Sequence, residues 1–118
     1  MMTADQETFL RQITQTLVER IRPEKIVLFG SYASDRVTPN SDIDLMVILD
    51  SNLRRDRRQE MISRALRPRR FPMDILAYTP AEVAACTATP GSFLSHILRT
   101  GKVLYERQSS RVAQPSTG

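Results

Sequence analysis

The sequence predicts an α+β fold for a single small domain. Short apolar runs with the character of β-strands alternate with amphipathic segments of helical period, and the segments end at glycine or proline. The connection between the first two predicted strands is too short for a usual parallel crossover. At 118 residues the chain is long enough to bury a core without metal or disulfide support.

A helix is predicted over residues 4–21. Its apolar side chains recur every four positions, as expected for one buried face, and they are Phe9, Ile13, Leu17 and Ile21. Thr3 and Gln6 resemble a capping box at the start of this helix, and Pro23 ends it.

Two strands are predicted next. The run KIVLF at residues 25–29 is short and apolar and ends at Gly30, as in a buried strand. The turn cluster PNS at residues 39–41 then leads into DIDLMVIL at residues 42–49, which we interpret as the second strand.

The middle of the chain predicts an arginine-rich helix and a third strand. The helix covers residues 53–66 and ends before Pro68. Its apolar side chains form a thin stripe that consists of Leu53, Met61, Ile62, Ala65 and Leu66. The run FPMDILAY covers residues 71–78, and Pro72 near its start indicates an edge strand, because proline cannot donate to a sheet ladder.

Two short helices and a closing strand complete the predicted domain. Thr79, Pro80 and Glu82 supply the N-cap, the first-turn proline and the returning acid of a capping box. A last helix runs from about residue 91 to Gly101 and is followed by the strand KVLYE.

The domain is expected to span residues 1–106, with a motif-bearing core at 24–106, and residues 107–118 are expected to form a mobile tail. No apolar run is long enough for a membrane span and no secretory leader is recognisable, so a cytoplasmic protein without a membrane partner is expected. Cys86 and His96 are the only cysteine and histidine, which excludes Cys/His metal sites. Both are interpreted as structural, with Cys86 as a small core residue.

Two aspartates, Asp42 and Asp44, lie at the start of the second predicted strand. Side chains alternate along a strand, so both carboxylates share one face and repel each other by about 2 kcal/mol at an effective dielectric of about 20. In one interpretation Asp42 caps the preceding turn and Asp44 points into solvent. In the other, a divalent cation lies between them, and ligation by oxygen alone favours Mg²⁺.

The residues before Asp42 add a phosphate-binding feature. The eleven-residue connection that begins at Ser31 favours antiparallel pairing, which brings Ser31 and the backbone amides of residues 31–34 beside both aspartates. If SYAS begins a helical turn, these free amides and the Ser31 hydroxyl form an anion cradle. A metal site beside an anion cradle predicts a nucleotide ligand.

A third acid, Asp74, lies among apolar residues in the next predicted strand. Taken alone, it would be interpreted as a hydrated edge-strand aspartate. Beside the two converging acids it favours a two-metal site, in which ions about 3.5–4 Å apart hold a phosphoryl group during in-line displacement.

These motifs resemble the minimal nucleotidyltransferase family of the DNA polymerase beta superfamily. The resemblance rests on GSYAS, on ten residues between Ser31 and Asp42, on DIDLMV and on MDILAYTPAE, and it covers residues 24–106. It implies a nucleotidyltransferase fold, with a mixed β-sheet flanked by α-helices and with ATP and two Mg²⁺ ions at one end.

The resemblance also implies roles for the matching residues. Gly30 and Ser31 would hold the triphosphate, and Asp42 and Asp44 would bind both ions. Asp74 would complete the first metal site and help remove the proton from an attacking hydroxyl. The reaction would transfer a nucleoside monophosphate to that hydroxyl and release pyrophosphate.

The chain departs from the family pattern just after the glycine–serine pair. Family members often continue as GSYARG, whereas Ser34 and Asp35 take the last two positions here. The arginine near the phosphates would then have to come from Arg36.

The acceptor is not determined by these residues. The chain has no room for a separate acceptor-binding domain, and in this it resembles small antitoxin members that pair with a helical HEPN-type toxin and can adenylylate its tyrosine. The expected function is therefore Mg²⁺-dependent AMP transfer from ATP to a partner's hydroxyl, within a homo- or hetero-oligomer. The alternatives are a non-catalytic antitoxin that acts by occlusion, and nucleotidyl transfer to a small molecule or RNA.

Arginines dominate the second predicted helix and the residues that follow it. Residues 54–70 contain eight arginines, and the chain as a whole carries a net charge of +4. The simplest interpretation is a solvated helix face with weak ion pairs, such as Glu60 with Arg64. The functional interpretations are docking of an acidic partner and RNA binding, and the absence of interleaved aromatic residues favours docking.

Overall fold

The computed structural model describes residues 4–30, 43–67 and 73–107. Along the chain it contains α1 (Ala4–Arg20), β1 (Lys25–Phe29), β2 (Ile43–Ile48), α2 (Arg55–Ala65), β3 (Met73–Tyr78), α3 (Pro80–Thr87), α4 (Phe93–Thr100) and β4 (Lys102–Glu106). The predicted α+β class is confirmed. The expected cap at Thr3 and the expected tail beyond Arg107 lie outside the described residues.

The strands form one mixed sheet in the order β3-β2-β1-β4. Strand β1 pairs antiparallel with β2 and β4, whereas β2 and β3 are parallel. The antiparallel pairing expected for the first two strands and the edge position expected for the third are both confirmed. The opposite edge strand, β4, has an irregular register beside Ile26 and Val27, and such a bulge discourages further strand pairing at a sheet edge.

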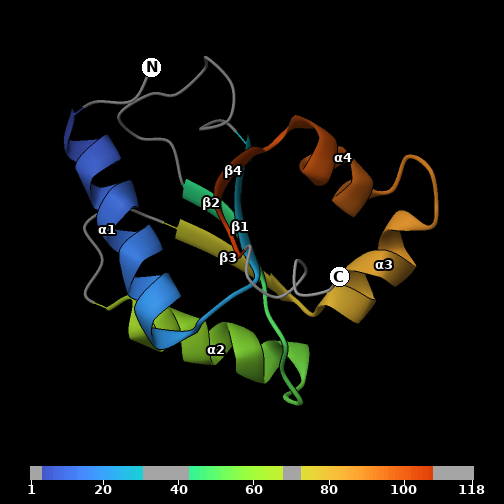
Figure 1. The fold of residues 1–118 in the computed structure, drawn as a ribbon, viewed down its shortest axis with the longest axis horizontal. Coiled ribbons are helices and arrows are strands. Elements are labelled where there is room, and N and C mark those ends of the chain that lie inside the picture. Colours follow the sequence, from blue (N-terminus) through green and yellow to red (C-terminus); the bar gives the residue numbers. More distant parts are fainter. Residues whose placement is uncertain (1–3, 31–42, 68–72, 108–118) are drawn as a thin grey trace, which may run out of the picture.

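A helical layer covers each face of the sheet (Figure 1). Helices α1 and α2 cover the face to which Ile43, Leu45 and Val47 belong. Helices α3 and α4 cover the other face, to which Met46 and Ile48 belong. This division confirms the alternation predicted for the second strand. Among the described helices, none combines the length and the apolar character that a membrane span needs.

Two expectations about buried side chains were wrong. Of the predicted apolar stripe, Ile62 and Leu66 are buried, but Leu53 and Met61 are exposed. Leu53 precedes α2, which begins at Arg55, and the buried residues of the helix are Arg58 and Ile62. Cys86 is exposed and not a core residue. The reason is that α3 has no buried residue. Its partly buried Val83 packs against the core on the sheet face of Met46 and Ile48.

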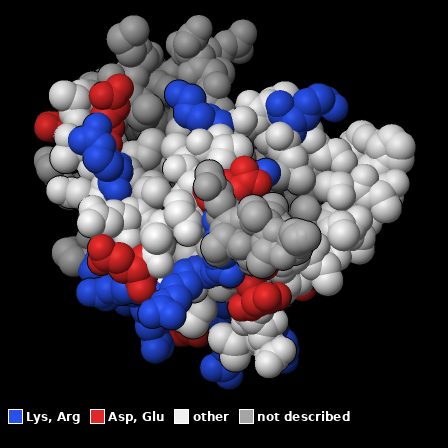
Figure 2. Space-filling view, in the orientation of Figure 1, with Lys and Arg blue, Asp and Glu red and all other residues white. Residues whose placement is uncertain are grey.

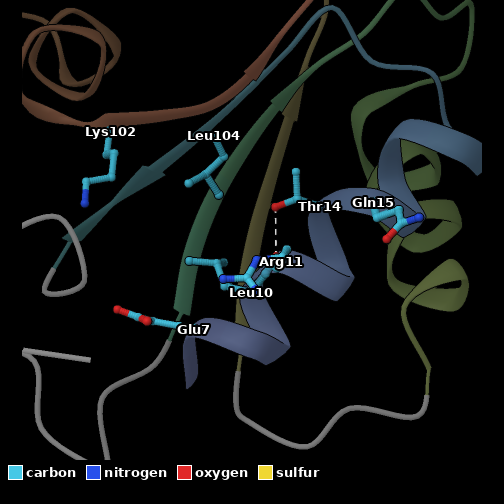
Figure 3. Close-up of a pocket in the computed structure, with 7 residues that line it drawn as sticks. All are labelled: Glu7, Leu10, Arg11, Thr14, Gln15, Lys102 and Leu104. Carbon is cyan, nitrogen blue, oxygen red and sulfur yellow. Dashed lines mark hydrogen bonds between the residues drawn. The ribbon is translucent and has the colours of Figure 1, made fainter. Parts of the chain in front are cut away.

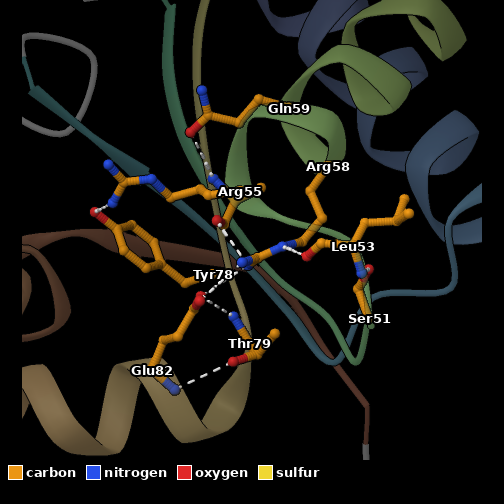
Figure 4. A network of polar contacts seen from close by, with 9 residues as sticks. Ser51, Leu53, Arg55, Arg58, Gln59, Tyr78, Thr79 and Glu82 are labelled. Carbon is orange, nitrogen blue, oxygen red and sulfur yellow. Dashed lines mark hydrogen bonds and ion pairs between the residues drawn. The ribbon is translucent and has the colours of Figure 1, made fainter.

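A buried arginine joins α2, β3 and α3 (Figure 4). The side chain of Arg58 is only 3% exposed, and its Nη1 and Nη2 donate to the two carboxylate oxygens of Glu82 at 2.7 and 2.8 Å. Its guanidinium also donates to the backbone oxygens of Leu53 at 2.9 Å and Ala77 at 3.1 Å. Glu82 in turn accepts from the Thr79 amide, so the predicted capping box is confirmed and is tied to α2.

Arg64 of α2 and Arg54, which precedes the helix, fit the simple prediction. Figure 2 shows basic side chains gathered over α2 together with acidic ones. Arg64 pairs with Glu60 at 3.1 Å and Arg54 with Asp56 at 3.0 Å, and all four side chains are largely exposed. Arg58 is the exception to the predicted solvated face, because it has a carboxylate and two carbonyls as partners inside the protein.

Candidate functional site

The end of β1 and the beginnings of β2 and β3 meet at one end of the sheet. This follows from the strand directions, because β1 runs against β2 while β3 runs along it. Gly30 directly follows β1, and Asp44 and Asp74 are the second residues of β2 and β3. Residues far apart in the sequence are thus brought to one location.

The two aspartates lie side by side. Asp44 and Asp74 are register partners in the parallel β2–β3 pair, so their side chains leave the sheet on the same face, from strands about 4.8 Å apart. Asp44 is half-buried and Asp74 is exposed. Like charges in neighbouring positions on one sheet face are destabilising. A cation between them would reverse the sign of that interaction.

Gly30 makes room for the Asp44 carboxylate. Its φ of +74° lies in the left-handed region, and a Cβ added there would overlap the Oδ2 of Asp44. The position therefore requires glycine both for its backbone conformation and for the close approach of the carboxylate.

Gly30→Ala should lower both the stability of the fold and the affinity of the candidate site for Mg²⁺. Left-handed backbone costs an L-residue about 1–2 kcal/mol, and the added methyl group would also displace the Asp44 carboxylate. We expect a lower urea midpoint and weaker Mg²⁺ binding, measured by chemical unfolding and by calorimetric titration.

Gly91→Ala is the matched control for this change. Gly91 has a similar φ of +79°, but a Cβ added there would meet nothing within 4 Å. It should show the loss from backbone strain alone, with Mg²⁺ binding intact. Equal effects of both substitutions on Mg²⁺ binding would contradict the role given to Gly30.

An aromatic pair adjoins the aspartates on the same face. Phe29 is the register partner of Asp44 in the β1–β2 pair. The ring of Phe93, the first residue of α4, meets the ring of Phe29 edge-to-face, with centroids 6.1 Å apart and an interplanar angle of 86°. Sequence reasoning did not single out Phe93, because it reads as one more apolar residue of an amphipathic helix.

The described residues include only part of the predicted site. Asp42, Ser31 and Arg36 lie outside them. Within residues 4–30, 43–67 and 73–107, no group of three or more acidic, His or Cys side chains is placed to hold a metal ion. Asp44 and Asp74 supply oxygen donors on one face, which fits Mg²⁺, and a third donor would have to come from elsewhere, with Asp42 as the predicted one.

A groove is present elsewhere in the described part of the chain. It has a volume of about 560 Å³ and lies between α1 and β4, with Leu10, Thr14 and Leu104 among its lining residues (Figure 3). Leu10 and Leu104 belong to the core on the α1–α2 face of the sheet. The groove is therefore separated by the sheet from the face that carries Asp44 and Asp74, and it is not part of the candidate site.

The sequence matches the family model described as "Polymerase beta, Nucleotidyltransferase" over residues 11–110. The chain belongs to the polymerase beta nucleotidyltransferase family. This match confirms the resemblance at the level of the family and includes every predicted site residue. Among curated proteins, none matches the sequence significantly.

A solved structure also resembles the nucleotidyltransferase domain described above. It is described as "Crystal structure of the toxin-antitoxin with AMP-PNP", and the likeness has a TM-score of 0.55 at 25% sequence identity. The likeness covers 83% of this chain and 73% of that chain.

Proposed function

We propose that this nucleotidyltransferase is an antitoxin that transfers AMP from ATP to a hydroxyl, most simply a tyrosine, of a partner toxin. The observation that carries the proposal is the side-by-side placement of Asp44 and Asp74 next to Gly30. In a nucleotidyltransferase, carboxylates at such a position suit metal-assisted transfer of a phosphoryl-type group.

The proposed reaction assigns a different task to each acid. The acceptor oxygen forms a bond to the α-phosphorus of ATP, the bond from that phosphorus to the oxygen bridging to the β-phosphate breaks, and pyrophosphate leaves. The exposed carboxylate of Asp74 takes the proton of the acceptor hydroxyl. Asp44 and Asp74, with Asp42, would hold Mg²⁺, which when bound neutralises charge on the phosphates.

The proposal of a toxin partner rests on the solved relative. That protein is described as a toxin-antitoxin with AMP-PNP, and AMP-PNP is an analogue of ATP. By similarity we propose a hetero-oligomer with a helical HEPN-type toxin. The exposed arginines Arg57 and Arg64 on α2, with Arg54 just before the helix, would favour docking of an acidic partner surface.

The test uses ATP labelled at either end of the triphosphate. The full chain is incubated with Mg²⁺ and the protein encoded by the adjacent reading frame, with α-labelled ATP in one reaction and γ-labelled ATP in another. We expect label on the partner only from α-labelled ATP, and none when EDTA removes Mg²⁺. Label from γ-labelled ATP would indicate a kinase instead.

The same reactions separate the alternative functions. Inhibition of the toxin without any transferred label would support occlusion by a non-catalytic antitoxin. Label on RNA or on a small molecule with no protein acceptor present would support the remaining alternative. Either outcome would contradict AMP transfer to a partner protein.

A further inference from the structure

We propose that Phe93, held in place by Phe29, is the surface on which the adenine base of ATP stacks. The inference rests on the proposed function and deepens it, because it names a residue that binds the base and not the phosphates. Its basis is that the exposed ring of Phe93 contacts Phe29, the cross-strand neighbour of Asp44.

The position of the aromatic pair suits a base site. Phe29 and Asp44 are cross-strand partners whose side chains leave the same sheet face, and Phe93 rests on Phe29. The ribose keeps a nucleobase at a distance from its phosphates, so a base should lie beside the metal-binding acids and not among them. Phe93 is in ring contact with Phe29, which is the cross-strand neighbour of Asp44.

Phe93 is also largely exposed to solvent. Its side chain is 60% exposed, whereas Leu94 and Ile97 of the same helix are buried against the sheet. Exposed apolar residues are common, and Leu53, Met61 and Val103 are others in this chain. Phe93 differs from them because it is an aromatic ring that contacts a second ring, Phe29, on the sheet face that carries Asp44.

The rings of Phe29 and Phe93 meet edge-to-face. In an edge-to-face pair, one ring presents its edge to the face of the other, so the contact fixes ring orientation without covering both faces of both rings. A ring that is oriented by one such contact and is otherwise largely exposed suits stacking of a base. Base–aromatic stacking is worth about 1–3 kcal/mol, which corresponds to about 5–150-fold in affinity.

The native chain has no tryptophan, so Phe93→Trp introduces a single fluorophore at the proposed base site. The full-length variant is titrated with MgATP and, separately, with magnesium tripolyphosphate, which lacks a base. We expect MgATP to change the tryptophan fluorescence and tripolyphosphate to leave it nearly constant. Leu53→Trp, at another exposed apolar position, should respond to neither ligand.

Affinity supplies the second measurement. Phe93→Leu keeps an apolar side chain against Phe29 but removes the aromatic face, and it should weaken MgATP binding about 5–150-fold while leaving magnesium tripolyphosphate binding unchanged. Unchanged MgATP affinity in Phe93→Leu would overturn the inference. Loss of partner binding with unchanged MgATP affinity would also overturn it, because the ring would then contact the partner.

Failure of this inference is distinguishable from failure of the proposed function. If the native protein binds MgATP and labels its partner but Phe93→Leu binds MgATP equally well, only the role of Phe93 is wrong. If the native protein binds neither MgATP nor magnesium tripolyphosphate, the nucleotide site itself is wrong, and both proposals are overturned.

Discussion

Replacing Asp74 with asparagine should slow adenylyl transfer by about 10²–10⁴-fold, the usual contribution of a general base. Asparagine preserves the size of the side chain but cannot take the acceptor proton. Because Asp74 lies beside Asp44, the substitution also removes one of two neighbouring like charges. We therefore expect the free energy of unfolding without Mg²⁺ to rise by up to about 1 kcal/mol. Transfer of α-label and thermal unfolding measure the two effects.

The combination of lost activity and retained stability distinguishes a catalytic role from simple unfolding. Asp50→Asn makes the same chemical change at an exposed position just beyond the opposite end of β2, and its transfer rate should equal that of the native protein. Mg²⁺ should raise the unfolding temperature of the native protein more than that of Asp74→Asn. Transfer at the native rate by Asp74→Asn would show that the residue is not the base.

Replacing Arg58 with alanine should lower the free energy of unfolding by about 3 kcal/mol, out of about 5–15 kcal/mol for a typical domain. The substitution leaves the carbonyls of Leu53 and Ala77 without their donor and opens a gap between α2, β3 and α3. Urea unfolding measures the loss. Arg57→Ala, at the next and exposed position, should change the free energy by no more than about 0.5 kcal/mol, and an equal loss there would contradict the role of Arg58.

The ion pair between Arg58 and Glu82 should also make the free energy of unfolding depend on pH. The hydrogen bonds from Arg58 and from the Thr79 amide lower the pKa of Glu82 from 4.5 to about 2. A carboxyl group whose pKa is lower in the folded state adds stability that is complete above the unfolded pKa and is lost as the pH falls through the folded pKa. The loss should therefore occur between about pH 4.5 and pH 2.

Glu82→Gln identifies the source of this dependence. The amide cannot ionise, so the variant should be less stable at pH 7 but lose less stability than the native protein on acidification. The Glu82 side chain is 41% exposed, so solvent reduces the size of the effect. Parallel pH profiles for the two proteins in urea unfolding would show that another group is responsible.

Much of the fold and part of the candidate site could be predicted because short stretches of sequence decide them. The alternation around Asp44 divides β2 between two cores, as residue order alone predicts. The capping box of Thr79 and Glu82 needs only residues three positions apart. The short connection after Gly30 favoured antiparallel pairing for the same reason: it limits how far the chain can travel.

Contacts between distant segments could not be predicted in this way. Arg58 was one of many arginines in the sequence, and its burial depends on Glu82, which lies 24 residues further along the chain. Cys86 was expected in the core, and it is exposed because α3 buries no side chain. The proposed role of Phe93 depends on its contact with Phe29, which belongs to β1 and is distant in the sequence.

By itself, the sequence determined the order of helices and strands, the faces of β2 and the acids that could bind metal. The packing of the whole chain was needed to make Asp44 and Asp74 register partners, to bury Arg58 and to leave Phe93 exposed against Phe29. The physical reason is that periodicity and capping depend on backbone geometry over a few residues. Register between strands, burial of a charge and exposure of a ring depend instead on which surfaces meet, and that is a property of the whole chain.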